Sequence, residues 1–140
     1  MQRIFLLFII SASLLFASGI AIVKKIGGDA FVKRNDHIIS LKAGDQLYEG
    51  DMLITKKNGK IGIIFDDGTL LSLGENSKLS INKYIFKPAN NNFDINLDMK
   101  KGLAAFESGK IGKLSPKSVK FKIPEGTIGI RGTKFLVEVK

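Results

Sequence analysis

The stretch Phe93-Asp94-Ile95-Asn96-Leu97-Asp98-Met99-Lys100 carries the clearest periodicity of the chain. Its apolar side chains occupy every second position, and polar or charged side chains fill the positions between them. Successive side chains of a β-strand point to opposite faces of a sheet, so this pattern predicts a strand with one buried and one wet face. The same alternation recurs over residues 119–123 and 134–139. Half-buried strands therefore set the fold.

Short apolar runs recur along the rest of the chain, with turn-forming residues between them. Asn58-Gly59 and Asp66-Asp67-Gly68 are typical of tight turns, because Asn, Asp and Gly tolerate the positive φ angles that such turns need. The mostly polar stretch 107–116 is predicted to be a loop. The predicted strands cover residues 20–26, 30–34, 38–41, 47–55, 61–65, 69–73, 78–86, 93–99, 103–106, 119–123 and 135–139.

About ten short strands at this spacing predict one all-β domain. The pattern alone leaves a sandwich, a barrel and a twisted solenoid open. A length of 140 residues favours a single domain, and 44% hydrophobic with 25% charged residues is the composition of a globular protein. The chain has no cysteine, which excludes disulfides, thiolate catalysis, zinc–thiolate sites and lipid attachment to an N-terminal cysteine.

The chain carries a formal net charge of +9, and lysine supplies most of it. Of its 22 basic residues only Arg3, Arg34 and Arg131 are arginines. Sequence-specific readers of nucleic acid favour arginine forks, so we expect no nucleic-acid partner. The lysines have two interpretations. They can reflect AT-rich coding, or they can form a cationic surface for anionic lipid, glycan or an acidic partner.

The N-terminus has the layout of a secretory signal peptide. Arg3 supplies a positive start, residues 4–16 form an uncharged and largely apolar run, and small residues follow at Ala17 and Gly19. We predict a signal peptide over 1–19, cleaved after Gly19 or nearby, a folded domain over 20–140 and a periplasmic location. An uncleaved anchor over 4–23 is the alternative, although the lysines just after it oppose the positive-inside bias. After cleavage no membrane-spanning segment is expected.

Residues able to carry catalysis or hold a metal are scarce. His37 is the single histidine and lies in a predicted turn without a nucleophile of recognisable context beside it. Asp66 and Asp67 with Glu75 are acidic, but their spacing fits no calcium loop, and turn chemistry accounts for the two aspartates. We therefore expect no catalytic residue, no cofactor and no metal, and a protein that is not an enzyme.

Several motifs appear in a fixed order between about residue 28 and residue 139. They are Gly44-Asp45, Gly50-Asp51, Thr55, Asp67-Gly68-Thr69, Asn76-Ser77, Pro124 and Arg131-Gly132-Thr133. Their order resembles that of the FecR domain, a periplasmic module known from regulators of iron–siderophore signalling. The resemblance implies a twisted β-solenoid or a curled, sandwich-like sheet, and an envelope binding or signalling module.

The signalling regulators of this family also carry a cytoplasmic anti-sigma segment and a further C-terminal domain. The chain opens on the predicted export segment and ends at Lys140, so we expect the sensory or binding module alone to carry over. Within that module, Asp67, Gly68, Thr69, Gly132 and Thr133 are interpreted as structural motif residues.

Two groups of residues are candidates for binding a partner. Arg131 can form a forked pair with a carboxylate or phosphate of a partner, or can pair inside the chain with Glu125 or Glu138. The second group is a lysine cluster, which can equally protect an edge strand from pairing with other chains. It comprises Lys117, Lys120 and Lys122.

Two functional hypotheses follow. The first is an envelope module that recognises another envelope component, and the alternative is a cationic binder of anionic cell-wall glycan or lipid.

Overall fold

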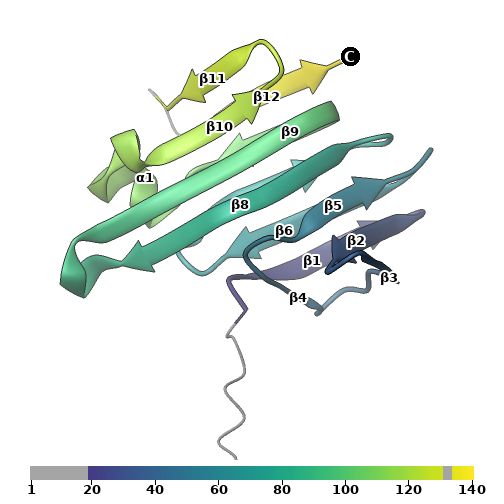
Figure 1. Cartoon of the computed structure of the whole chain (residues 1–140), viewed down its shortest axis with the longest axis horizontal. Helices are drawn as coiled ribbons and strands as arrows, with labels where there is room; N and C mark the ends of the chain where they lie inside the picture. Colours follow the sequence, from purple (N-terminus) through teal and green to yellow (C-terminus); the bar gives the residue numbers. More distant parts are fainter. Residues whose placement is uncertain (1–18, 131–133) are drawn as a thin grey trace, which may run out of the picture.

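The computed structural model describes residues 19–130 and 134–140, and nearly all of its regular structure is β-strand (Figure 1). Short helical turns flank the longest strand: η1 (Pro88–Asn90) precedes it, and α1 (Lys110–Leu114) and η2 (Pro116–Ser118) follow it. No helix in these two ranges is long and apolar enough to cross a membrane. The strands are β1 (Ala21–Gly27), β2 (Ala30–Arg34), β3 (His37–Ser40), β4 (Gln46–Leu47), β5 (Met52–Thr55), β6 (Lys60–Phe65), β7 (Leu70–Leu73), β8 (Lys78–Lys87), β9 (Asn92–Glu107), β10 (Val119–Ile123), β11 (Gly126–Gly129) and β12 (Lys134–Val139).

The strands form one curled sheet that folds into two layers sharing β9. Layer A has the strand order β4-β1-β6-β7-β9-β12, and layer B has the order β3-β2-β5-β8-β9-β10-β11. Every pairing is antiparallel except that of β9 with β10. Figure 1 shows β8, β9 and β10 running side by side across one layer. The all-β prediction is confirmed, and of the two implied forms the curled, sandwich-like sheet is the one observed.

The two layers meet where β9 passes Gly102. The first part of β9 pairs with β8 and β10, and its last residues pair with β7 and β12. Gly102 has φ +105°, and a Cβ atom on it would overlap Ser77, which follows the β7–β8 turn. Only glycine combines that backbone angle with so close an approach. The strand can therefore change layers without ending.

The core lies between the layers and is lined by alternate residues of each strand. Ile95, Leu97 and Met99 are fully buried, as the alternation predicts. An aromatic cluster closes the core beside the last strands, with ring centroids 5.2 Å apart for Phe106 and Phe135 and 5.2 Å apart for Phe121 and Phe135. These three rings come from β9, β10 and β12, so they pack both layers together.

Four details differ from the sequence prediction, and one of them is β11, which lies outside every predicted strand range. The run 47–55 is two strands, β4 and β5, because Gly50 at φ +92° turns the chain between them. The runs 93–99 and 103–106 are one strand, since Gly102 bends β9 but does not end it. The predicted loop 107–116 contains α1, which is only five residues long and too short to show a helical period. Residues 1–18, which hold the predicted signal peptide, lie outside the described residues.

Candidate binding surface

The Asp67-Gly68-Thr69 turn links β6 and β7 and places a buried carboxylate at its centre. Gly68 has φ +88°, and its N–H donates to the carbonyl of Phe65 at 2.9 Å. Asp67 Oδ1 accepts hydrogen bonds from Thr69 N at 3.2 Å and from the Tyr84 hydroxyl at 2.8 Å. Asp67 is only 2% exposed, so these bonds replace the water that the carboxylate loses.

The same turn holds the start of α1, more than forty residues later in the chain. Asp67 Oδ2 accepts from Thr69 Oγ1 at 2.8 Å and from Ile111 N at 3.1 Å, and Thr69 Oγ1 accepts from Gly109 N at 3.0 Å. Burial, together with the hydrogen bond to Asp67, raises the pKa of Tyr84 well above its ordinary value. The neutral hydroxyl is therefore kept as a donor.

The two Gly-Asp pairs form the same four-residue turn twice. In each, the glycine has φ above +90° and the aspartate accepts from the backbone N–H three residues earlier. That bond is 2.8 Å long both for Asp45 with Lys42 N and for Asp51 with Tyr48 N. A repeated sequence pair thus produces a repeated local structure.

Asp51 differs from Asp45 in being 1% exposed and paired with Arg34. Arg34 Nε and Nη2 donate to its two oxygens at 2.8 and 2.7 Å, and the guanidinium lies 4.6 Å from the centroid of the Tyr48 ring. The hydrogen bond to Asp51 raises the pKa of Arg34. Sequence reasoning missed this fork, and its one signal is an isolated arginine in a lysine-rich chain.

The acidic residues considered as metal ligands do not come together. Glu75 lies at the opposite end of β7 from Asp67 and accepts from Asn58 N at 2.9 Å. Within residues 19–130 and 134–140, no three His, Cys, Asp or Glu side chains stand close enough to hold a metal ion. In the same ranges every buried side-chain nitrogen and oxygen has a hydrogen-bond partner. The buried polar groups described above are thus engaged with one another, and His37 lies exposed at the start of β3.

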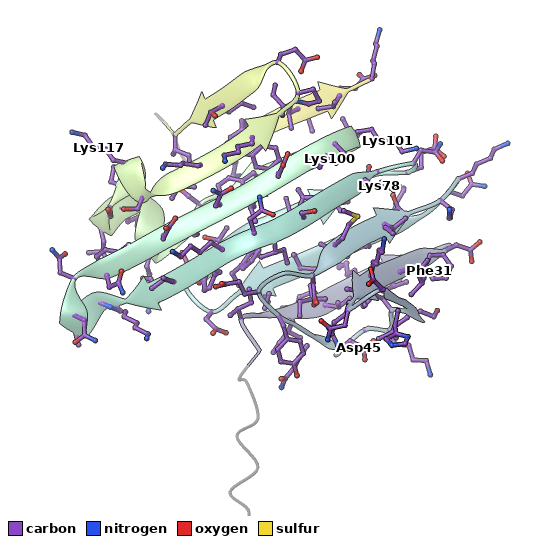
Figure 2. All side chains as sticks on the ribbon, in the orientation of Figure 1. Phe31, Asp45, Lys78, Lys100, Lys101 and Lys117 are labelled. Carbon is purple, nitrogen blue, oxygen red and sulfur yellow. The ribbon has the colours of Figure 1, made fainter. Side chains whose placement is uncertain are left out.

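The lysine candidates occupy two elements. Lys120 and Lys122 lie on the outer face of β10, directly opposite Asn96 and Asp98 of β9. Lys117 lies in η2, and Figure 2 shows it at the far side of the layer from Lys100 and Lys101. Lys117 and Lys120 line one surface hollow of about 570 Å³, whereas Lys122 does not.

The edge-protection interpretation of Lys120 and Lys122 is wrong. Strand β10 pairs with β9 on one side and with β11 on the other, so it is an inner strand and β11 forms the edge of layer B. Arg131, Gly132 and Thr133 lie outside the described residues.

The outer face of layer A carries exposed leucines on neighbouring strands, with the charged residues Glu107, Lys134 and Glu138 among them. Leu70 of β7 is 41% exposed, Leu103 of β9 is 40% exposed and Leu136 of β12 is 70% exposed. Leu136 stands directly opposite Ala105, and Leu70 opposite Ile64 on β6. A hollow of about 450 Å³ lies over these strands; it is lined by Leu70, Ser72, Ala105, Phe106, Glu107, Lys134, Phe135 and Leu136. Apolar side chains gathered in this way mark a binding surface better than leucines scattered singly.

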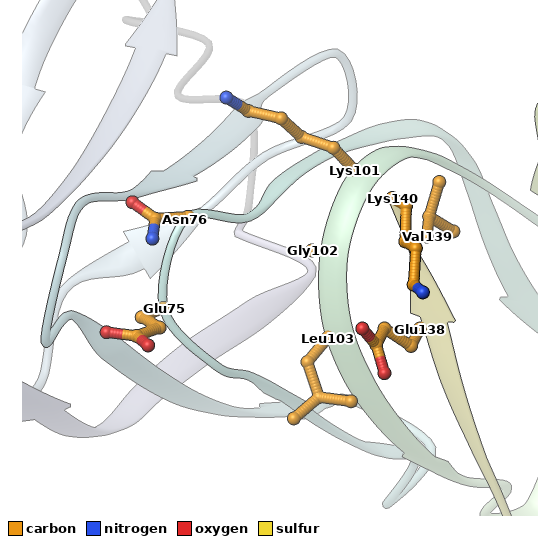
Figure 3. A pocket seen from close by; sticks show the side chains of 8 residues that line it. All are labelled: Glu75, Asn76, Lys101, Gly102, Leu103, Glu138, Val139 and Lys140. Carbon is orange, nitrogen blue, oxygen red and sulfur yellow. The ribbon is translucent and has the colours of Figure 1, made fainter.

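A second hollow of about 440 Å³ lies at the bend of β9 (Figure 3). Lys101 and Leu103 border it from β9, Glu75 borders it from the β7–β8 turn, and Glu138 borders it from β12. Its rim carries both signs of charge and continues the apolar face on the side of Leu103. It therefore offers polar contacts beside the exposed leucines.

Comparison with known proteins places this architecture in a family. No curated protein sequence matches the chain. A solved structure described as a cell surface anchoring domain is similar, with 30% sequence identity, a TM-score of 0.43, and coverage of 44% of this chain and 83% of that chain. The model of the family described as FecR protein matches residues 51–140, from the Asp51 turn through the whole of β9 and β12. The resemblance seen in the sequence motifs is thereby confirmed, and the chain belongs to the FecR family.

Proposed function

We infer that this chain is an exported, non-enzymatic FecR-type module that recognises another protein of the bacterial envelope. The observation that carries the proposal is the family match over residues 51–140. Under this proposal residues 1–19 act as the export signal, residues 20–140 form the binding domain, and the domain works in the periplasm. The buried Asp51 and Asp67 then serve the scaffold, which leaves recognition to the surface.

The outer face of layer A is the surface that we assign to this partner. Its exposed leucines lie on adjacent strands of a rigid sheet, and sites on such elements keep their geometry well. The partner would present an apolar patch to Leu70 and Leu136 and polar groups to the rim near Glu75 and Lys101. An apolar core with a polar rim is the usual anatomy of a protein interface.

Site-specific photo-crosslinking in the exporting cell tests the proposal. A photoreactive residue at Leu70 or Leu103 should give one discrete adduct whose mass differs from that of a dimer of this chain. The same residue at Ile38, which is 65% exposed on β3, serves as the matched control and should not give that adduct. Leu70→Glu should weaken the adduct formed from position 103. Identical adducts from all three positions, or none, would contradict the assignment.

The alternative function is binding of anionic glycan or lipid by Lys117, Lys120 and Lys122. It is favoured by the net charge of +9 and by the hollow that Lys117 and Lys120 share. Its affinity should fall steeply as salt rises, because exposed charges are screened beyond about 10 Å at 0.1 M salt. Changing the three lysines to glutamate should abolish binding to anionic liposomes or cell-wall glycan. Equal binding by the native protein and the triple variant would rule the alternative out.

A further inference from the structure

The last strand of the chain, β12, forms an edge of layer A. Among the described residues β12 pairs with β9 alone, over six consecutive residues and without a bulge. Figure 1 shows it at the rim of the curled sheet, where the C-terminus lies. Proteins usually keep edge strands short or interrupt them with proline or bulges, since an unpaired edge invites another strand. Strand β12 is six residues long and has no proline and no bulge, and its two charged residues, Lys134 and Glu138, have opposite signs.

The hydrogen bonds of layer A determine which backbone groups of β9 point to which neighbour. In an antiparallel ladder, the N–H and C=O of one residue point to one neighbouring strand, and those of the next residue point to the other. Gly74 N donates to Leu103 O at 2.8 Å. The backbone N–H and C=O groups of Leu103, and of every second residue of β9 after it, are therefore directed to β7. The bond from Phe65 N to Thr69 O directs the backbone groups of Thr69, and of every second residue after it, to β6. The backbone groups of Leu70 and Ser72 are then directed to β9, which agrees with the direction found for Leu103.

The residues of β9 that alternate with Leu103, Ala105 and Glu107 therefore direct their backbone N–H and C=O groups to β12. One of them is Phe106, which stands opposite Phe135. Phe135 and Val137 consequently direct their backbone groups to β9. The N–H and C=O groups of Lys134, Leu136 and Glu138 are directed away from it, toward the free side of the strand.

The side chains of β12 are complementary to those of a second β12. If two copies align antiparallel about a twofold axis at Leu136, Lys134 of each copy stands opposite Glu138 of the other. Phe135 then stands opposite Val137, and Leu136 opposite Leu136. Lys134 and Glu138 are both exposed; Lys134 lies 3.8 Å from Glu107 of its own chain, and Glu138 makes no ion pair with the described residues. Each facing position thus carries either opposite charges or two apolar side chains.

We propose that two copies of this chain pair through the outer edges of β12 and join their layers A into one continuous sheet. Lys134, Leu136 and Glu138 are the residues whose backbone groups face outward, so their pairs would exchange about six hydrogen bonds. The half-buried Phe135 and Val137 would be covered by the other copy. The same alignment joins the apolar outer faces of both copies into a twofold-symmetric surface.

The other edges of the sheet are less suited to this pairing. Strand β4 has two residues, and β11 has four, of which two are glycines. Strand β3 is also exposed and apolar at Ile38 and Ile39. Its four residues, His37–Ser40, provide no pair of opposite charges about a twofold axis. Charge complementarity therefore selects β12.

A charge swap tests the pairing with the full chain, purified in the form that the cell accumulates. Lys134→Glu and Glu138→Lys each place like charges opposite one another, and like charges directly opposite destabilise a strand pair. Each single variant should raise the dimer dissociation constant in sedimentation velocity by about tenfold or more. The double variant Lys134→Glu/Glu138→Lys restores opposite charges and should return the constant to within about threefold of the native value.

A cysteine probe tests the register independently of charge. The chain has no cysteine of its own, so Leu136→Cys introduces a single thiol at the proposed twofold axis. A short bismaleimide should convert this variant to a covalent dimer, whereas Ile38→Cys, on another exposed edge, should stay monomeric. Far-UV circular dichroism should match the native protein in every variant, since these positions are exposed.

Three results would overturn the proposal. They are a native protein that stays monomeric up to roughly 1 mM, a double variant no better than the single variants, and cross-linking that is as efficient at position 38 as at position 136. These measurements use purified protein without any partner. Failure of the dimer therefore leaves recognition through Leu70 and Leu103 standing, and failure of that recognition leaves the dimer standing.

Discussion

Two buried aspartates show how the interior of this sheet accommodates charge. Asp51 is compensated by the Arg34 fork, while Asp67 is surrounded by hydroxyl and backbone N–H donors. The sequence predicts the local part of each arrangement, because turn chemistry depends on neighbouring residues. It does not predict Arg34, Tyr84 or Ile111, since these partners reach the aspartates only through the pairing of distant strands.

Removing Arg34 should be costly because it leaves a buried carboxylate without its cation. We expect Arg34→Ala to lower the free energy of unfolding by about 3 kcal/mol. Lys83→Ala is the matched control, since the Lys83–Asp94 pair is exposed and 3.7 Å long, and it should change stability by less than about 1 kcal/mol. Urea unfolding measures both. Equal effects of the two variants would mean that Asp51 is stabilised mainly by its backbone donor from Tyr48.

Tyr84 should make stability depend on alkaline pH. Its raised pKa means that the folded protein holds the phenolic proton more tightly than the unfolded chain, whose tyrosines ionise near 10.0. Unfolding therefore releases a proton above that pH, and this part of the stability is present below pH 10 and is lost as pH rises further. Tyr84→Phe should be less stable by about 1–2 kcal/mol at pH 8.

The difference between the native protein and Tyr84→Phe should shrink as the pH of the urea titration rises beyond 10. If the free energies of unfolding of the two proteins differ by the same amount throughout this pH range, the pKa of Tyr84 is not raised in the folded protein.

For strand β9, the sequence predicts the first part correctly and the bend incorrectly. Its alternation over 93–99 gives the buried face correctly, because period two is a property of any extended chain. Its continuation past Gly102 was not predicted, since a glycine between two apolar runs is usually a boundary. The strand bends at Gly102 because the backbone there approaches Ser77 closely. Ser77 is 25 positions away in the sequence, so a local pattern does not predict this contact.

Gly102→Ala should therefore destabilise the protein strongly. The new methyl group would meet Ser77 while the backbone keeps φ +105°, so we expect a loss of more than about 2 kcal/mol. Gly27→Ala is the control, because the nearest atom to its added Cβ is Lys60 Cβ at 3.7 Å and φ is not positive. Thermal unfolding should separate the two variants. Similar melting temperatures would show that the bend tolerates a side chain.

At the scale of the whole molecule, the all-β class follows from the sequence but the two layers do not. Periodicity gives the face of each strand and says nothing about its neighbours. Hence the sequence could not show that β10 is an inner strand, and edge protection stayed open beside partner binding as an interpretation of its lysines. The sequence also does not predict that β12 pairs with the end of β9, because the two strands are far apart along the chain.

The shared strand should make the two layers unfold together. Tyr84 lies on β8 in layer B, next to the Asp67 turn in layer A, and β9 belongs to both layers. Tyrosine fluorescence of a Tyr48→Phe variant, which leaves Tyr84 as the single tyrosine, and far-UV circular dichroism should therefore give coincident urea transitions. An early loss of tyrosine fluorescence with the sheet signal retained would mean that the layers melt separately.

The position of β9 in the chain also matters for how the molecule forms. A polypeptide that appears gradually from its N-terminus, at a ribosome or a translocation channel, can complete neither layer until Glu107 has emerged, because both await the same strand. Such long-range pairing closes slowly. Nascent chains of this protein should thus keep both layers incomplete until late in their synthesis.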